Sequence, residues 1–462
     1  MPSLSKTELL AGLPPEPTIA PRPAAAKVVV LDDDPTGTQT VHGIPVLTTW
    51  EQSALEAELR APERCFYILT NSRAFPALKA CAINQEIGGN LARAAAHTGR
   101  AITVVSRSDS TLRGHFPAET DALASALGNH FHGTLIIPAF FAGGRLTIGD
   151  THYVADGDIL TPAGETEFAR DASFGYRASN LRSWVEEKTG GRVRATDVLS
   201  ISLAQLRTDD FQTIANQLLG LVRGGVAIVN AAAPGDLAVL THALALTERA
   251  GRHYLFRTAA DFVAAYAAIS PRALLTADEL RSSDHTSGGL LVAGSYVGKT
   301  SAQLDALFSA CPALVKIEVA VDRLLQPECR SAEEFRCIRL AETEIKAGRS
   351  VALFTSRRLV TGSDAIQSLS IGEIVSASLV QIVRSLSSRP RWLVAKGGIT
   401  SSDTATQALG IKRALVLGQA QPGVPVWRAG PESKWPDLAY VVFPGNVGGI
   451  EALARLISPL LT

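Results

Sequence analysis

Short apolar runs alternate with longer amphipathic stretches along the first half of the chain. The runs are rich in Val, Ile and Leu, and the longer stretches carry apolar residues at helical spacing. This alternation is typical of a largely parallel sheet covered by helices. The predicted strands are 28–31, 65–70, 101–106, 134–139, 198–203, 226–231 and 254–258. The predicted helices are 48–60, 78–97 and 118–127.

A polar stretch rich in Ser and Gly, residues 281–289, precedes a second series of apolar runs. The strands predicted there are 290–295, 314–319, 351–356, 392–396, 414–417 and 440–443. We therefore expect an α/β protein of two domains, each a mostly parallel sheet covered by helices, with the active site in the cleft between them. The expected divisions are a flexible N-terminal arm at 1–26, a first domain at 27–283 and a second at 289–462.

Composition narrows the class of protein. Lys plus Arg and Asp plus Glu number 44 each among 462 residues, so no net charge favours nucleic acid or an anionic membrane as a partner. Five cysteines form no CxxC pair, and no apolar run is long enough to span a bilayer. We expect a cytoplasmic protein with reduced thiols. The Ala-rich helix 78–97 could serve a homodimer interface, although packing on the sheet explains it as well.

The first predicted strand is followed at once by three carboxylates, Asp32, Asp33 and Asp34, and then by a turn through Pro35 and Gly37. Ligands of α/β sheets bind at the carboxyl ends of the strands. Adjacent carboxylates repel one another unless a cation or a polyhydroxy ligand compensates them. A solvated turn would use the same residue types, but three acids directly after a buried strand favour a binding site.

A second polar segment, SRSDSTLRGH at 106–115, follows another strand of the same predicted sheet. Asp109, Ser110 and Thr111 suit hydroxyl groups, and the planar fork of Arg113 matches a carboxylate. A sugar acid needs both. Helix capping by Asp109 or Ser110 is the structural alternative. Residues 71–73 repeat the pattern weakly, and the irregular insertion at 140–187 is expected to be functional because of its length.

Three glycine-bearing loops follow strands in the second half: AGSYVGKT at 293–300, KGGITSSD at 396–403 and FPGNVGG at 443–449. Glycine lets backbone amides approach phosphate oxygens, and the hydroxyls of Ser295, Thr400 and Ser401 can add donors. The three loops together favour a nucleotide site. The first also fits a relaxed phosphate-loop pattern, but no strand ending in Asp follows to hold magnesium, so we interpret this match as partly accidental.

Six motifs, in order and across nearly the whole chain, resemble the four-carbon acid sugar kinase family: DDDPTG, SDSTLRG, PAGETEFARDASFGYRASNL, GSYVGKTSAQL, GGITSSD and FPGNVGG. The resemblance implies a sugar-acid-binding domain followed by a nucleotide-binding domain. It also implies phosphorylation of threonate, erythronate or oxo-tetronate with ATP as its Mg²⁺ complex.

The resemblance extends to single residues. It matches the acidic turn at Asp33, Asp34 and Gly37, the sugar-acid loop at Asp109, Ser110, Thr111 and Arg113, and nucleotide contacts at Ser295, Gly397, Gly398, Ile399, Thr400, Gly445, Asn446 and Gly448. Ile399 replaces the Asp or Glu that many members carry after the paired glycines. The metal ligands are therefore left open.

The mechanism expected for such a kinase is mostly positioning and charge neutralisation. Arg113 would hold the substrate carboxylate, and Asp109 and Ser110 its hydroxyls. Asp33 would accept the proton of the attacking hydroxyl, while Asp34 orients that hydroxyl or helps with the metal.

Two other functions are compatible with the sequence. LDDDPTG also fits the Asp-x-Asp-x-Thr pattern of haloacid dehalogenase-like phosphatases, with Asp32 as nucleophile, Asp34 as acid and YILTN as the second motif. That interpretation leaves the second domain unexplained. A non-catalytic sugar-acid sensor would bind its ligand without turning over ATP.

Overall fold

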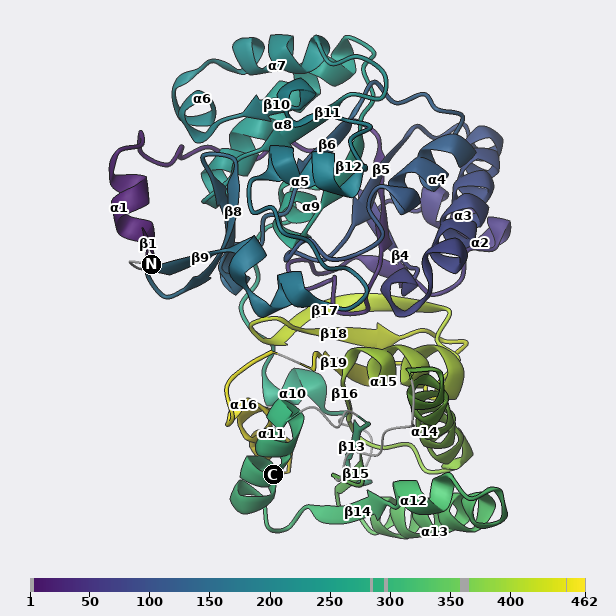
Figure 1. The fold of residues 1–462 in the computed structure, drawn as a ribbon. Helices are drawn as coiled ribbons and strands as arrows, with labels where there is room; N and C mark the ends of the chain where they lie inside the picture. Colours follow the sequence, from purple (N-terminus) through teal and green to yellow (C-terminus); the bar gives the residue numbers. More distant parts are fainter. Residues whose placement is uncertain (1–3, 283–285, 295–297, 358–364, 446, 462) are drawn as a thin grey trace. The chain divides into compact units, whose positions relative to one another are not determined.

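The computed structural model describes residues 4–282, 286–294, 298–357, 365–445 and 447–461. It divides the chain into two compact units, Met1–Pro271 (unit 1) and Arg272–Thr462 (unit 2). Each unit is a sheet with helices packed on it, which confirms the predicted α/β class (Figure 1).

Unit 1 is built on a parallel sheet in the order β10-β11-β6-β12-β5-β2-β4-β3. All six residues of β2, KVVVLD, are buried, as expected for a central strand covered on both faces. The strands are β2 (Lys27–Asp32), β3 (Pro45–Leu47), β4 (Cys65–Leu69), β5 (Ile102–Arg107), β6 (Thr134–Ile137), β10 (Leu199–Ile201), β11 (Val226–Val229) and β12 (Leu255–Thr258).

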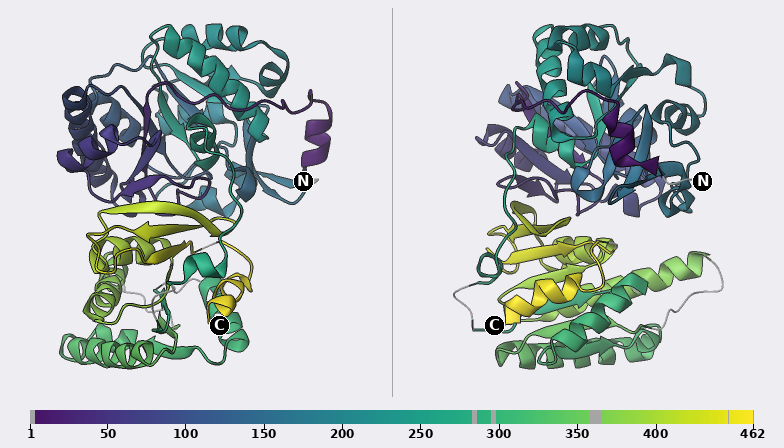
Figure 2. Two further views of the ribbon diagram at one scale, coloured as in Figure 1. Left: turned by 180° about the vertical axis from the view of Figure 1, so that it is seen from behind. Right: turned by 90° about the vertical axis from the view of Figure 1, so that its left-hand side faces the viewer.

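Apart from α1, the helices of unit 1 lie on this sheet, and α2, α3 and α4 pack side by side, as do α7 and α8 (Figure 2). A core of Val, Leu, Ile and Phe side chains joins α2 and α3 to β2, β4 and β5. The helices are α1 (Lys6–Ala11), α2 (Gln52–Arg60), α3 (Ala77–Thr98), α4 (Ala118–Ala126), α5 (Leu181–Lys188), α6 (Leu203–Thr208), α7 (Phe211–Leu219), α8 (Pro234–Arg249) and α9 (Ala260–Tyr266).

The insertion that we expected to be irregular contains regular structure. It forms an antiparallel sheet in the order β1-β9-β8-β7, from β1 (Leu4–Ser5), β7 (Arg145–Ile148), β8 (Thr151–Asp156) and β9 (Ile159–Pro162). The hairpin between β7 and β8 turns through Gly149 and Asp150, both at positive φ. Asp is an uncommon residue at positive φ, so the sequence signal for this turn was weak.

Unit 2 has a mixed sheet in the order β17-β18-β19-β16-β13-β15-β14, in which only the pairs that involve β18 are antiparallel. Strand β18 was not predicted, although Pro422 and Gly423 mark the turn that precedes it. The strands are β13 (Leu290–Ala293), β14 (Val315–Val319), β15 (Val351–Thr355), β16 (Leu393–Lys396), β17 (Arg413–Gln421), β18 (Val424–Ala429) and β19 (Ala439–Phe443).

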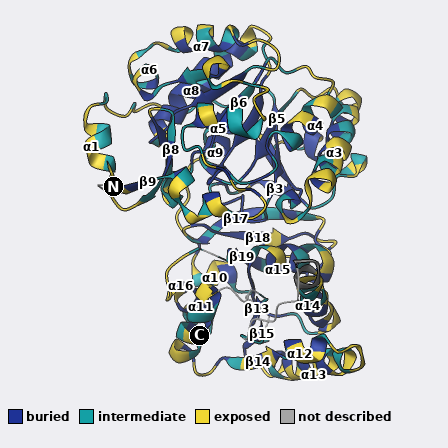
Figure 3. Cartoon of the chain, viewed as in Figure 1, coloured by how far each residue is buried: buried dark blue, intermediate teal, exposed yellow. Residues whose placement is uncertain are grey.

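The strands of unit 2 are mostly buried, whereas the outward faces of its helices are exposed (Figure 3). Its helices are α10 (Ala277–Leu280), α11 (Gly298–Ala310), α12 (Val321–Leu324), α13 (Pro327–Lys346), α14 (Ala365–Ser385), α15 (Gly398–Asp403) and α16 (Ala452–Leu461). Residues before 281 already belong to this unit, because Leu275 donates its amide to Gln419 O at 2.8 Å. The polar stretch at 281–289 therefore lies within unit 2.

The N-terminal segment is attached to unit 1 by hydrogen bonds. Ser5 Oγ donates to Asp158 at 2.5 Å, and Glu16 accepts the amide of Gly235 at 2.9 Å. Arg22 donates its amide to Thr241 Oγ1 at 2.8 Å. Such contacts between distant residues are invisible in the Pro- and Ala-rich sequence from which we expected a flexible arm.

Candidate functional site

The predicted acidic and sugar-acid segments of unit 1 lie at one edge of its sheet. Asp32 ends β2 and lies opposite both Leu69 of β4 and Arg107 of β5, and Arg107 lies opposite Thr258 of β12. All four strands are parallel, so the segments that follow them leave the sheet at the same edge. This edge is the candidate sugar site.

Asp32 is buried beneath this edge. Its carboxylate lies 3.3 Å from Arg107 Nη1. Burial raises the pKa of Asp32 to about 8, because the attraction of Arg107, which lowers the pKa, is outweighed; the repulsion of Asp33 and Asp34 raises it further. Gly37 covers it so closely that a Cβ there would lie 1.9 Å from Asp32 Oδ2. Only glycine allows this turn, which explains the predicted importance of Gly37.

The two carboxylates expected to do chemistry differ in their partners. Asp33 accepts a hydrogen bond from Ser108 Oγ at 2.8 Å through Oδ2, while its buried Oδ1 has no hydrogen-bond partner. Asp34 accepts from the Thr36 amide and hydroxyl at 2.8 and 2.6 Å and pairs with Arg73. Burial raises the pKa of Asp34, but Arg73 and Thr36 outweigh burial and hold it below its usual value.

Asp109 is held by two arginines. Arg73 Nη1 lies 3.2 Å from Asp109 Oδ1, Arg113 Nε lies 2.8 Å from Oδ2, and the Thr111 hydroxyl also donates to this carboxylate. Burial raises its pKa, but the two guanidinium groups outweigh burial, and the net pKa lies well below the usual range. Arg73 thus links Asp34 to Asp109 and joins the two predicted segments into one cluster.

The insertion fixes the backbone of the sugar-acid loop. His152 Nε2 donates to Ser110 O at 2.7 Å, and the Tyr176 hydroxyl donates to Thr111 O at 2.6 Å. Because a carbonyl can only accept, Nε2 carries the proton, and neutral His152 accepts from the Thr147 hydroxyl at Nδ1, 3.0 Å away. Burial lowers the pKa of His152 to about 4.

Arg257 completes the cluster and was missed in the sequence. Its Nη2 donates to Ser108 Oγ at 3.2 Å and to Arg113 O at 3.0 Å, and its guanidinium lies 5.1 Å from the Trp184 ring. Ser108 therefore accepts from Arg257 and donates to Asp33, which orients the Asp33 carboxylate. Arg257 lies far along the chain at the end of β12, and only the parallel pairing of β12 with β5 brings it here.

In unit 2 the three predicted glycine loops follow neighbouring strands. Ala293 of β13 pairs with Lys396 of β16, which pairs with Phe443 of β19, so all three loops leave the sheet at one edge. A Cβ at Gly294 would lie 2.6 Å from Thr400 Oγ1, which shows how closely the first two loops approach. Ser295 and Asn446, two of the predicted nucleotide contacts, lie outside the described residues.

Lys396 joins the second and third loops. It is fully buried, and its Nζ donates to Pro444 O at 2.7 Å and to Gly445 O at 3.0 Å. Burial, with a smaller contribution from Lys299, lowers its pKa to about 7. Gln303 of α11 donates to Val447 O and Gly449 O at 3.1 and 2.9 Å and so attaches the first helix to the third loop.

The remaining predicted contacts occupy the second and third loops. Gly397 and Gly448 adopt positive φ values of 115° and 77°, where a side chain would be strained. Thr400 is largely buried, whereas the Ile399 side chain is 60 % exposed. Among the described strands of unit 2 none ends in Asp or Glu, so the magnesium ligand of a phosphate-loop enzyme is missing from this part.

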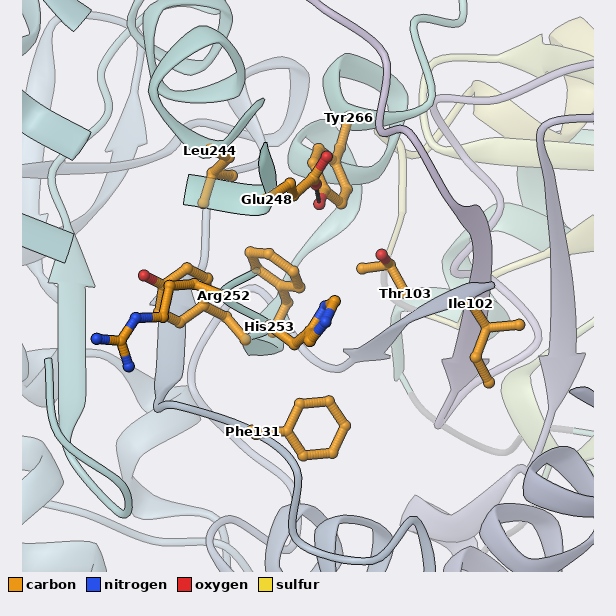
Figure 4. Close-up of a pocket in the computed structure, with 10 residues that line it drawn as sticks. Ile102, Thr103, Phe131, Leu244, Glu248, Arg252, His253 and Tyr266 are labelled. Atoms are coloured by element: carbon orange, nitrogen blue, oxygen red, sulfur yellow. Dashed lines mark hydrogen bonds between the residues drawn. The ribbon is translucent and has the colours of Figure 1, made fainter. Parts of the chain in front are cut away.

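The pocket shown in Figure 4 lies elsewhere. Its lining includes Ile102 at the start of β5 and Tyr254 just before β12, which places it at the amino ends of strands whose carboxyl ends carry the candidate site. Aromatic side chains and the hydrogen-bonded pair of Tyr266 and Glu248 line most of it. It is separate from the candidate sugar site.

Family models cover most of the chain. One described as "Sugar-binding N-terminal domain" matches residues 28–266, and one described as "Nucleotide-binding C-terminal domain" matches residues 290–453. The chain therefore belongs to the family of proteins that pair a sugar-binding N-terminal domain with a nucleotide-binding C-terminal domain. The acidic cluster lies in the matched sugar-binding region and the three glycine loops in the nucleotide-binding region.

Solved structures share the fold of this protein. A Haemophilus influenzae protein of the DUF1537 family matches with a TM-score of 0.63 at 17 % identity, covering 94 % of this chain and 100 % of its own. A Salmonella typhimurium LT2 protein matches with a TM-score of 0.66 at 18 % identity, covering 94 % and 98 %. No curated protein matches. None of the helices in the described ranges is long and apolar enough to cross a membrane.

We predict that His152 makes the protein sensitive to acid. A folded-state pKa of about 4 against an ordinary value of 6.5 means that the unfolded chain binds the proton more tightly, so stability falls as pH drops from 6.5 towards 4. This group should lower the free energy of unfolding by about 2 kcal/mol between pH 7 and pH 5.

Chemical denaturation at the two pH values measures this difference. In His152→Gln, whose amide can still donate to Ser110 O but does not titrate, the loss on acidification should shrink by about 2 kcal/mol. The control is His130→Gln, because His130 is exposed. An equal loss in wild type and His152→Gln would contradict the assignment.

Proposed function

We propose that this protein is a cytoplasmic kinase that transfers the γ-phosphate of ATP to a hydroxyl of a four-carbon sugar acid. The observation that carries the proposal is the burial and hydrogen bonding of Asp33 in the sugar-binding domain. It is a buried carboxylate at a strand end, oriented by Ser108, with one oxygen that has no hydrogen-bond partner. Arg107 Nη1 lies 3.9 Å from that oxygen, beyond hydrogen-bond distance. We infer that a substrate hydroxyl donates to the Asp33 carboxylate and gives up its proton to it, which is the task of a kinase base.

The choice of Asp33 as base follows from the partners of the other carboxylates. Asp34 is engaged by Arg73 and Thr36, and Asp109 by Arg73, Arg113 and Thr111. Groups whose oxygens are already occupied serve better to orient a ligand than to accept a proton. We therefore assign Asp34 and Asp109, with Ser110 and Thr111, to positioning the substrate.

An acidic substrate suits the cations of the same edge. Arg73, Arg107, Arg113 and Arg257 all contact the loops that follow β2, β4 and β5. A carboxylate can accept two parallel hydrogen bonds from a guanidinium, which a neutral sugar cannot do. The cluster thus combines a base for a hydroxyl with a cationic surrounding that suits an acid group, the two features of a sugar acid.

The nucleotide would be held by the three loops of unit 2, with Gly397, Gly398, Thr400, Gly445 and Gly448 nearest its phosphates. No group of three His, Cys, Asp or Glu side chains suited to a metal occurs among the described residues. Mg²⁺ is often held largely by substrate phosphates and water. We propose that it arrives as the ATP complex, and we assign it no protein ligand here.

The raised pKa of Asp32 weakens the phosphatase alternative. A phosphoaspartate nucleophile must be ionised, whereas burial raises the pKa of Asp32 to about 8. The sensor alternative shares the binding site and differs only in lacking turnover.

The decisive experiment is ADP release from MgATP with threonate, erythronate and the 2- and 3-oxo-tetronates. Turnover confined to one or two acids supports the kinase and names its substrate. ATP binding without turnover would indicate another acceptor or a sensor. Absence of ATP binding would refute the nucleotide assignment, and phosphate release from a phosphosugar, lost in Asp32→Asn, would establish the phosphatase.

We predict that Asp33→Asn lowers kcat by about 10²- to 10⁴-fold, because the variant cannot accept the proton of the attacking hydroxyl. The KM for ATP should change little, since Asp33 belongs to the sugar-binding domain. Steady-state kinetics with the best acid measures both values, and Asp322→Asn on the exposed side of α12 is the control. Near-normal turnover in Asp33→Asn together with none in Asp109→Asn would move the base to Asp109.

We predict that Lys396→Met weakens ATP binding about tenfold or more, because the Pro444 and Gly445 carbonyls lose their shared donor and the third loop is released from β16. Calorimetric titration with MgATP measures the change, and Lys412→Met, an exposed lysine of the same unit, is the control. An unchanged dissociation constant in a folded Lys396→Met variant would exclude Lys396 from positioning the loop.

A further inference from the structure

Arg113, the residue expected to bind the substrate carboxylate, already has anionic partners. Its Nε lies 2.8 Å from Asp109 Oδ2 and 3.2 Å from Thr111 Oγ1, and its Nη1 lies 3.6 Å from Asp171 Oδ2. Two carboxylates therefore offset the charge of this guanidinium. Arg113 has little positive charge left to attract an anionic ligand.

Arg145 is a second cation beside Arg113 and is compensated less. It begins β7, and its Nη1 donates to Gly143 O, while its Nε is buried without a hydrogen-bond partner. Within the described ranges no carboxylate forms an ion pair with Arg145. Burial lowers the pKa of Arg145. Asp109 raises this pKa and Arg113 lowers it, so both ends of the sugar-acid loop act on Arg145.

One aromatic ring brings the two arginines together. The guanidinium carbon of Arg113 lies 5.1 Å, and that of Arg145 5.7 Å, from the centroid of Phe168, which belongs to a 3₁₀ turn at Glu167–Arg170 in the same insertion. Cation–π attraction stabilises each cation at such distances.

We propose that Arg145 binds the carboxylate of the acceptor and thereby makes the site selective for acids over neutral sugars. This inference rests on the proposed kinase function and names the residue that recognises the acid group. A partly buried cation with no carboxylate at ion-pair distance is unfavourable, and an incoming carboxylate offsets its charge. Asp109, Ser110 and Thr111 would then hold the hydroxyls between this carboxylate and Asp33.

The assignment gives the insertion a definite task. Arg145 and Phe168 both come from residues 140–187, while His152 and Tyr176 of the same segment hold the backbone of the sugar-acid loop. The insertion thus contributes the group that selects the acid and the contacts that fix the loop beside it.

The test compares Arg145→Met, Arg145→Lys and the control Arg170→Met, an exposed arginine of the same insertion. With the acid that wild type phosphorylates best, Arg145→Met should raise KM about 10- to 100-fold, with kcat and the KM for ATP within about twofold of wild type. The KM for the neutral amide of that acid should stay unchanged. Arg145→Lys should recover part of the loss, because it restores the charge without the planar fork.

Calorimetric titration of threonate and erythronate without nucleotide separates this inference from the kinase proposal. If wild type binds an acid but turns over no ATP, the kinase proposal fails, and loss of binding in Arg145→Met still supports Arg145. If wild type is active and a folded Arg145→Met keeps the wild-type KM and affinity, Arg145 is excluded while the kinase stands. Failure of wild type to bind any of these acids would overturn the assignment.

Discussion

The candidate sugar site depends on cations that compensate the charge of carboxylates buried at the end of one strand. Asp32, Asp33 and Asp34 follow one another at the end of β2, and Asp109 joins them from β5. Removing such charges from water is costly unless cations pair with them. Arg107 lies against Asp32 and Asp33, and Arg73 joins Asp34 to Asp109. These two arginines therefore compensate the negative charge that the fold buries at this edge.

The balance between burial and charge compensation differs among the four carboxylates and gives them different roles. Burial without sufficient compensation favours the protonated form of Asp32, so that residue supports the turn. Abundant compensation keeps Asp34 and Asp109 ionised and fixed. Asp33 accepts a hydrogen bond from Ser108 through one oxygen, while its other oxygen has no hydrogen-bond partner. Four chemically identical side chains thus acquire different tasks from their surroundings.

A related arrangement organises the nucleotide-binding unit with the opposite sign of charge. There a single buried cation, Lys396, holds the carbonyls of Pro444 and Gly445, and Gln303 holds the other end of the same loop. Lys396 and Gln303 thus donate hydrogen bonds to carbonyl oxygens of the third glycine loop. Backbone amides remain the groups best suited to meet phosphate oxygens.

Much of the fold was readable from the sequence. Runs such as KVVVLD and the alternation of strands with amphipathic helices predicted two α/β units, because burial on both faces demands continuous apolar strands. Strand β18 and the hairpins of the insertion were missed. Their strands pair antiparallel across short turns, and they lack the long helical spacers on which the interpretation relied.

The sequence by itself determined which local segments carry the chemistry, since acids, hydroxyls and glycines directly after strands are local patterns. Only the tertiary structure decided how these groups are partnered. Arg73, Arg107, Arg145 and Arg257 come from four separate segments, and each resembles an ordinary surface arginine in the sequence. The parallel register of β2, β4, β5 and β12 and the fold of the insertion bring them to the carboxylates. Electrostatic partnership depends on distance in space, which the order of residues along the chain does not encode locally.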